Sequence, residues 1–92
     1  MRAVLLTGDK RVIVVDREKP EPKAHEVLVR TMASAICRSD MSIYYGTPVV
    51  GGAPTGENHV IPGHEAAGVV VAVGSAVRNV RVGDRVAGYL AV

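Results

Sequence analysis

A chain of 92 residues is long enough for one domain, and its formal net charge of +2 excludes a strongly basic, polyanion-binding protein. The basic residues are scattered, and aromatic side chains are limited to three tyrosines, so we expect no nucleic-acid partner. The single cysteine excludes an intrachain disulfide, and the apolar N-terminal stretch is too short for a signal peptide or a membrane span. We therefore expect a cytoplasmic protein without a membrane partner.

The residue pattern favours β-strands over most of the chain. Valine dominates the apolar residues, which make up 48% of the sequence, and β-branched side chains suit pleated strands. Two apolar runs, residues 3–7 and 11–17, flank Gly8-Asp9-Lys10 and predict a hairpin with a tight turn. Gly68 lies inside a further apolar run and indicates a bulge or a close approach of another backbone. The other strands are predicted at residues 26–35, 66–73 and 86–92, with a tight turn at residues 82–85.

One short helix is predicted at residues 38–45, because Met41, Tyr44 and Tyr45 share one helical face and Gly46 follows as a stop signal. Residues 46–63 form a glycine- and proline-containing loop, and loops of that length are often functional. The sequence therefore predicts one mainly β domain over residues 1–92, with a single helix.

Three residues in this pattern carry the chemistry of a metal site. The thiol of Cys37, the imidazole of His64 and the carboxylate of Glu65 are all zinc-ligand types. Cys37 comes just before the predicted helix, whose first N–H groups favour the thiolate form, and Asp40 is placed to accept the second ring proton of a ligating histidine.

Structural roles for the same residues stay open from spacing alone. A lone cysteine such as Cys37 is more often a small buried apolar residue than a metal ligand, and His64 with Glu65 is commonly the exposed edge of a strand. Asp40 would then only satisfy the helix dipole, and Ser39 would only cap the helix.

A wider pattern resembles a known family. The run GHEAAG at residues 63–68, followed by Gly74 and Val77, resembles the signature of the medium-chain, zinc-dependent alcohol dehydrogenases. The run ICRSD at residues 36–40 is similar to that family's Cys-x-Ser/Thr-Asp segment, and residues 77–86 are similar to its strand-linking turn. The resemblance extends over nearly the whole chain, in the family's order.

The resemblance implies a role for each residue of the candidate site. Cys37 and His64 would be ligands of a catalytic zinc, and Glu65 would lie in or beside the metal's coordination shell. Ser39 would hydrogen-bond the reacting alcohol and pass on its proton, and Asp40 would be the hydrogen-bond partner of His64.

The resemblance also implies a cofactor and a fold. Arg38 matches a position that contacts the pyrophosphate of the cofactor in some members, although an exposed arginine at a helix start explains it equally well. The implied fold is a GroES-like, partly open β-barrel. It would form the N-terminal part of an oxidoreductase that uses zinc and NAD or NADP to interconvert an alcohol or polyol and its carbonyl. The full-length parent would be a homo-oligomer acting on a small molecule.

The sequence departs from the family pattern at two places. Many members have a histidine where this chain has Ser42, so a proton relay would end at that hydroxyl, run through water or be absent. No third catalytic-zinc ligand, structural zinc loop or Rossmann domain occurs within the 92 residues, so we expect the isolated chain to be inactive.

Two other readings remain at this stage. The chain could be a stand-alone GroES-like barrel that uses an edge strand for assembly or partner binding, since unpaired strand edges invite pairing. It could also belong to the zinc-free quinone-reductase branch, against which Cys37 and the GHE run at residues 63–65 both count.

Overall fold

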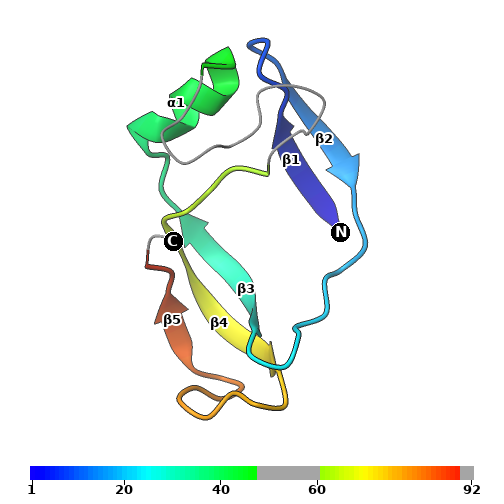
Figure 1. The fold of residues 1–92 in the computed structure, drawn as a ribbon, viewed down its shortest axis with the longest axis vertical. Coiled ribbons are helices and arrows are strands. Elements are labelled where there is room, and N and C mark those ends of the chain that lie inside the picture. The colour runs from blue at the N-terminus through cyan, green and yellow to red at the C-terminus, as the bar shows by residue number, and fades with distance from the viewer. Residues whose placement is uncertain (48–60, 90–92) are drawn as a thin grey trace. The chain divides into compact units, whose positions relative to one another are not determined.

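The structure is a computed structural model that describes residues 1–47 and 61–89 (Figure 1). These residues form mainly β-structure with one short helix, as predicted. None of the helical residues described forms a segment long and apolar enough to cross a membrane. The elements in chain order are β1 (Arg2–Leu6), β2 (Val12–Asp16), β3 (Val27–Ser34), α1 (Arg38–Tyr45), β4 (Ala66–Val73) and β5 (Arg85–Ala87).

The chain divides into two compact units, and it passes from one to the other more than once. The first unit comprises Met1–Glu18 and Ile36–Gly63, and the second comprises Lys19–Ala35 and His64–Val92. The first therefore holds β1, β2 and α1, and the second holds β3, β4 and β5.

In the first unit, β1 and β2 form the predicted antiparallel hairpin. Ala3 and Leu5 of β1 are buried, whereas Val4 between them is 43% exposed, so the strand alternates as a half-buried strand should. The turn is held by Asp9, which accepts hydrogen bonds from the hydroxyl of Thr7 and, at 2.7 Å, from Nε of Arg11. The Thr7 hydrogen bond, together with the Arg11 guanidinium, holds the pKa of Asp9 below its usual value.

The helix α1 has the predicted boundaries, and both of its ends are capped. Cys37 is the N-cap residue, and its N–H donates to Oδ2 of Asp40 at 2.9 Å. Asp40 is the one buried residue of this helix. At the other end Gly46 adopts a left-handed conformation, with φ of 71°, and its N–H donates to the Ile43 carbonyl at 3.1 Å.

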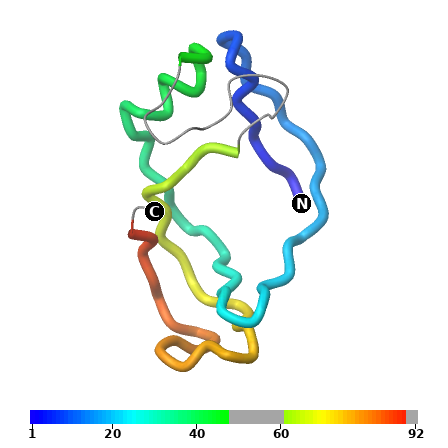
Figure 2. Tube along the Cα trace, in the orientation of Figure 1, coloured from blue at the N-terminus to red at the C-terminus, as the bar shows by residue number. Residues whose placement is uncertain are grey.

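In the second unit, β4 is the central strand of a three-stranded antiparallel sheet, with β3 on one side and β5 on the other (Figure 2). Val70 of β4 is completely buried. The pairing of β3 with β4 changes register between Leu28 and Val29 and again between Thr31 and Ala33.

Two glycines of this unit lie where another backbone comes too close for a side chain. A Cβ atom on Gly68 would overlap the carbonyl oxygen of Arg30 in β3. A Cβ atom on Gly74 would overlap the carbonyl oxygen of Lys23, and the Gly74 N–H donates to the Glu26 carbonyl at 2.8 Å. The predicted close approach at Gly68 is therefore confirmed.

The predicted extent of the last strand was wrong. β5 begins at Arg85 and ends at Ala87, and Gly88 and Tyr89 lie outside it. Glycine weakens strands, and the Tyr89 side chain is 96% exposed and so gains no burial from strand pairing. Residues 48–60 of the predicted loop and residues 90–92 lie outside the described part of the chain.

Replacing either tightly packed glycine by alanine should destabilise the second unit. We expect Gly68→Ala and Gly74→Ala each to lower the free energy of unfolding by about 1–3 kcal/mol, because the neighbouring backbone must move. Chemical denaturation followed by circular dichroism measures this. Gly88→Ala is the matched control, since its Cβ would lie 3.5 Å from the Ala66 carbonyl oxygen, an ordinary contact. Equal losses in all three variants would contradict the explanation.

Asp40→Ala should weaken the start of α1, because the Cys37 N–H loses its acceptor. We expect a loss of about 1 kcal/mol in the free energy of unfolding, and a smaller loss for Asp40→Asn, whose amide oxygen still accepts. Hydrogen exchange of the Cys37 amide should become faster in Asp40→Ala. An unchanged exchange rate would show that another group holds this amide.

Candidate metal centre

The β3–β4 ladder determines where the candidate donors leave the sheet. Ser34 pairs with Ala66 at the end of the ladder, and the Ala35 N–H donates to the Glu65 carbonyl oxygen at 3.2 Å. Cys37 follows Ala35 by two residues along the chain, and His64 directly precedes Glu65. Residues far apart in the sequence are therefore brought close by the backbone pairing itself.

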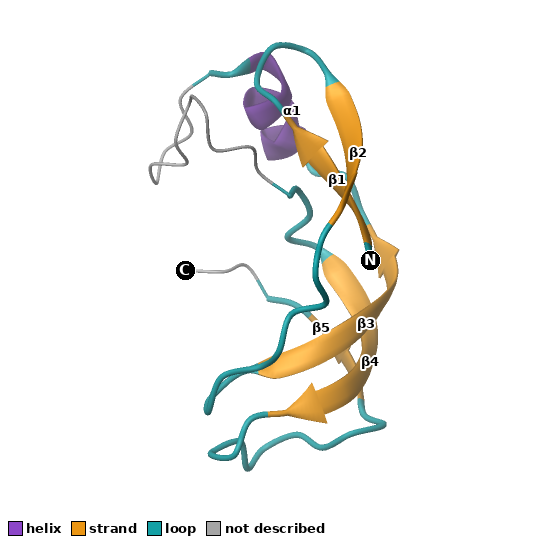
Figure 3. Ribbon diagram, turned by 90° about the vertical axis from the view of Figure 1, so that its right-hand side faces the viewer, coloured by secondary structure: helices purple, strands orange, loops and turns teal. Residues whose placement is uncertain are grey.

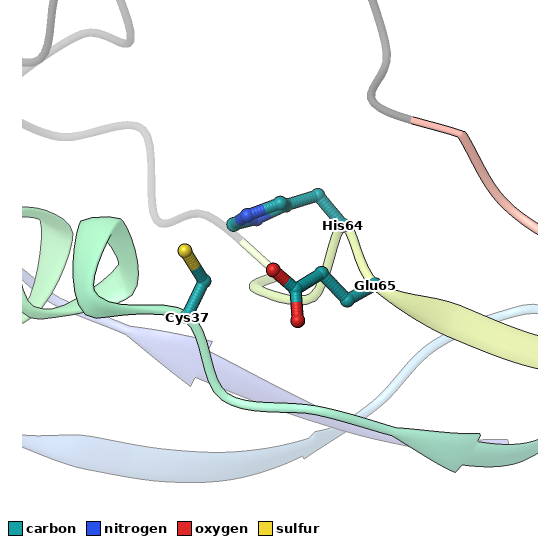
Figure 4. Close-up of side chains that lie close together, drawn as sticks. All are labelled: Cys37, His64 and Glu65. Atoms are coloured by element: carbon teal, nitrogen blue, oxygen red, sulfur yellow. The ribbon is translucent and has the colours of Figure 1, made fainter.

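The predicted zinc ligands form one group in the structure. Sγ of Cys37, a ring nitrogen of His64 and a carboxylate oxygen of Glu65 all lie within 4.8 Å of one another. Figure 4 shows the three side chains extending toward a common space. Cys37 and His64 are half-buried, whereas Glu65 is exposed.

The donor set fits a zinc ion in its atoms and in its spacing. Zinc binds thiolate sulfur, imidazole nitrogen and carboxylate oxygen at 2.0–2.3 Å, so donors on a tetrahedral ion lie about 3.5 Å apart. Separations of up to 4.8 Å require only a small inward movement of the side chains. A catalytic zinc typically has three protein ligands and leaves a fourth position for water or substrate.

The helix start contributes the other predicted residues. Arg38 and Ser39 are the first two residues of α1 and are exposed, while Asp40 is only 6% exposed. Asp40 accepts the Cys37 N–H, and its own N–H donates to the Cys37 carbonyl at 3.0 Å. The bond expected from His64 to Asp40 stays a prediction.

Our sequence reasoning missed the direct support that Asp40 gives to Cys37. The signal was available, because an acidic residue three positions after an N-cap residue is the spacing of a capping box. Ser42 lies further along α1, where its carbonyl oxygen accepts from the N–H of Thr47 at 2.9 Å and from its hydroxyl at 3.1 Å.

Comparison with known proteins identifies the family of this chain. The family model described as the alcohol dehydrogenase GroES-like domain matches residues 23–91. Glucose 1-dehydrogenase from Methanocella arvoryzae is 40% identical over 88 residues, which are 94% of this chain and 24% of that protein.

Solved structures give the same result. An alcohol dehydrogenase from Escherichia coli CFT073 complexed with NADH has a TM-score of 0.77 and 37% identity, covering 95% of this chain and 23% of that one. The zinc-dependent alcohol dehydrogenase 2 from Streptococcus pneumonia has a TM-score of 0.78 and 32% identity, covering 95% and 24%. The chain thus spans about a quarter of the length of these relatives. Because the family model covers most of the chain, the chain belongs to the GroES-like domain family of the medium-chain, zinc-dependent alcohol dehydrogenases.

Proposed function

We propose that residues 1–92 form the N-terminal part of the catalytic domain of a zinc-dependent oxidoreductase. This enzyme would interconvert an alcohol or polyol and its carbonyl by hydride transfer to or from NAD or NADP. The observation that carries the proposal is the group of Cys37, His64 and Glu65, whose donor atoms lie within 4.8 Å of one another. The names of the relatives, a glucose dehydrogenase and two alcohol dehydrogenases, support the same reaction class.

Cys37 and His64 would bind the metal, and Glu65 would alter its coordination by binding or leaving it. A bound zinc ion supplies a Lewis acid that polarises an alcohol or carbonyl oxygen. Two half-buried ligands give the metal a fixed position, whereas the exposed carboxylate of Glu65 is free of tight packing and can yield its place to water or substrate. Asp40 would orient His64 by accepting its second ring N–H, which fixes the tautomer that binds metal.

Ser39 would bind the substrate, and Arg38 would bind the cofactor. The exposed hydroxyl of Ser39, two residues after Cys37, can donate to and accept from a substrate hydroxyl, so it would carry the proton that the substrate loses or gains. Ser42 or water would receive that proton next. Arg38 would contact the pyrophosphate of NAD or NADP, because a guanidinium matches phosphate oxygens in a bidentate manner.

The activity itself would belong to a protein of the relatives' length. Three donors make a metal site, but none of the described residues forms a nicotinamide-binding motif, so the 92-residue chain alone would be inactive. We also propose that the full-length protein works in the cytoplasm as a homo-oligomer, on a small-molecule substrate. The single cysteine is consistent with a reducing compartment.

Zinc binding tests the proposal directly. We expect the chain to bind one zinc ion, and we expect Cys37→Ala and His64→Ala each to weaken binding by at least about tenfold, because each removes one of three donors. Glu65→Gln should weaken it less, since that donor is exposed. Isothermal titration calorimetry against a zinc chelator gives the affinities, and elemental analysis gives the stoichiometry.

His25→Ala is the matched control, because this exposed histidine lies outside the donor group and should leave zinc affinity unchanged. Zinc affinity that falls equally in His25→Ala and His64→Ala would indicate surface binding only. Zinc bound equally by the wild type and by Cys37→Ala would rule out the proposed site.

A further inference from the structure

We propose that the turn between β1 and β2 is a positioning element for Cys37, acting through the helix α1. This inference rests on the proposed metal site, because it concerns how the chain holds one ligand of that site. All the residues involved belong to the first unit.

The turn contacts the last residues of α1 through backbone atoms. The N–H of Lys10 donates to the carbonyl oxygen of Tyr44 at 2.9 Å. The Cα atom of Gly46 lies directly against Gly8, so that a Cβ on Gly46 would overlap the Gly8 carbonyl oxygen. Nζ of Lys10 also lies 5.7 Å from the ring centroid of Tyr45. Figure 3 shows α1 beside the connection that joins β1 to β2.

Three residues take left-handed backbone conformations to make this contact. Gly8 has φ of 78°, Gly46 has φ of 71° and Lys10 has φ of 66°. A lysine in this region costs free energy, and Lys10 is the only non-glycine residue in it among those described. Such a conformation persists where surrounding contacts compensate it, and the hydrogen bond to Tyr44 is such a contact.

The helix needs this external support. It has only eight residues, and isolated helices of that length are unstable in water. Asp40 is its only buried residue, while Met41 and Tyr45 are 38% and 51% exposed, so apolar burial holds it weakly. Its last turn contains no basic residue, and the Lys10 backbone and side chain supply the donor and the positive charge that a helix C-terminus favours.

A movement of the C-terminal end of α1 also moves Cys37, which lies at its N-terminal end. The helix is about 12 Å long at 1.5 Å per residue, and over that length it moves as a rigid rod. Cys37 is fastened to the first turn by the Asp40 carboxylate and the Asp40 N–H. Displacement of Gly46 from Gly8 therefore tilts the helix and moves the sulfur of Cys37 from the position in which the first unit holds it.

The test replaces each of two glycines that have positive φ by asparagine and compares the metal binding of the two variants. Asparagine tolerates positive φ, so Gly46→Asn isolates the overlap with Gly8. Gly83→Asn is the matched control, since Gly83 has φ of 96° and open space around its Cβ position.

The probe is Co(II), which takes the same donors as zinc and absorbs strongly when a thiolate binds it. We expect Gly46→Asn to weaken Co(II) binding by about tenfold and to reduce the thiolate band, and Gly83→Asn to change affinity less than twofold.

A second variant tests whether a weaker metal affinity in Gly46→Asn reflects only a loss of folded protein. In Gly8→Asn, whose side chain tolerates the φ of 78° at this position, the new Cβ lies 3.5 Å from the Gly46 Cα, an ordinary contact, so the effect should have the same sign and be smaller. A purely structural role would lower the free energy of unfolding without changing the Co(II) affinity of the folded molecules. That result in both variants would overturn the inference.

Failure of the proposed function gives a different result. It would appear as a wild type whose Co(II) spectrum equals that of Cys37→Ser. In that case the positioning role is read from hydrogen exchange of the Cys37 amide, which requires no metal. Faster exchange in Gly46→Asn but not in Gly83→Asn supports the role, and equal exchange in both overturns it.

Discussion

The backbone hydrogen bond from Ala35 to the carbonyl oxygen of Glu65 continues the β3–β4 ladder to the point where the candidate zinc donors leave it. Everything at the site depends on this pairing, because Cys37 and His64 are far apart in the sequence and each lies within two residues of the bonded pair. The ladder in turn depends on the absence of side chains at Gly68 and Gly74, which lets neighbouring backbones approach. The geometry of the sheet therefore determines, through main-chain atoms, where the residues of the candidate metal site begin.

Short-range patterns in the sequence were sufficient to predict most of the strands and the helix. The hairpin, the helix with its stop at Gly46, and β4 were all predicted, because turn residues and side-chain periodicity are short-range properties. The close approach at Gly68 was predicted for the same reason. The last strand was predicted too long, since the aromatic Tyr89 favours a strand in the sequence although it lies outside β5 and is 96% exposed.

The candidate site was only partly accessible to the same reasoning. Ligand types alone favoured Cys37 as a buried apolar residue, and the family pattern decided in favour of metal. No periodicity could show that the Ala35–Glu65 pair brings the donors together, because that is a long-range contact. Nor could it show that the helix end lies against the hairpin turn, since the contact involves Gly8 and Gly46, which have no side chains to form a pattern.

The two changes of register between β3 and β4 have a consequence for how this chain tolerates insertions and deletions. Val27 with Val73 and Ala33 with Ala67 follow the same register, whereas the pairs between Val29 and Thr31 are offset from it by one residue. The first change leaves Val71 of β4 without a register partner, and the second leaves Met32 of β3 without one, so the two irregularities cancel. Deleting Met32 alone would remove the second irregularity and leave Ala33 paired with Ala67, because Met32 has no partner to lose. The unpaired Met32 is therefore a position where β3 can lose a residue without changing the pairs next to the candidate metal site, whereas deleting one residue between Ser34 and Cys37 would draw Cys37 back by about 3.3 Å.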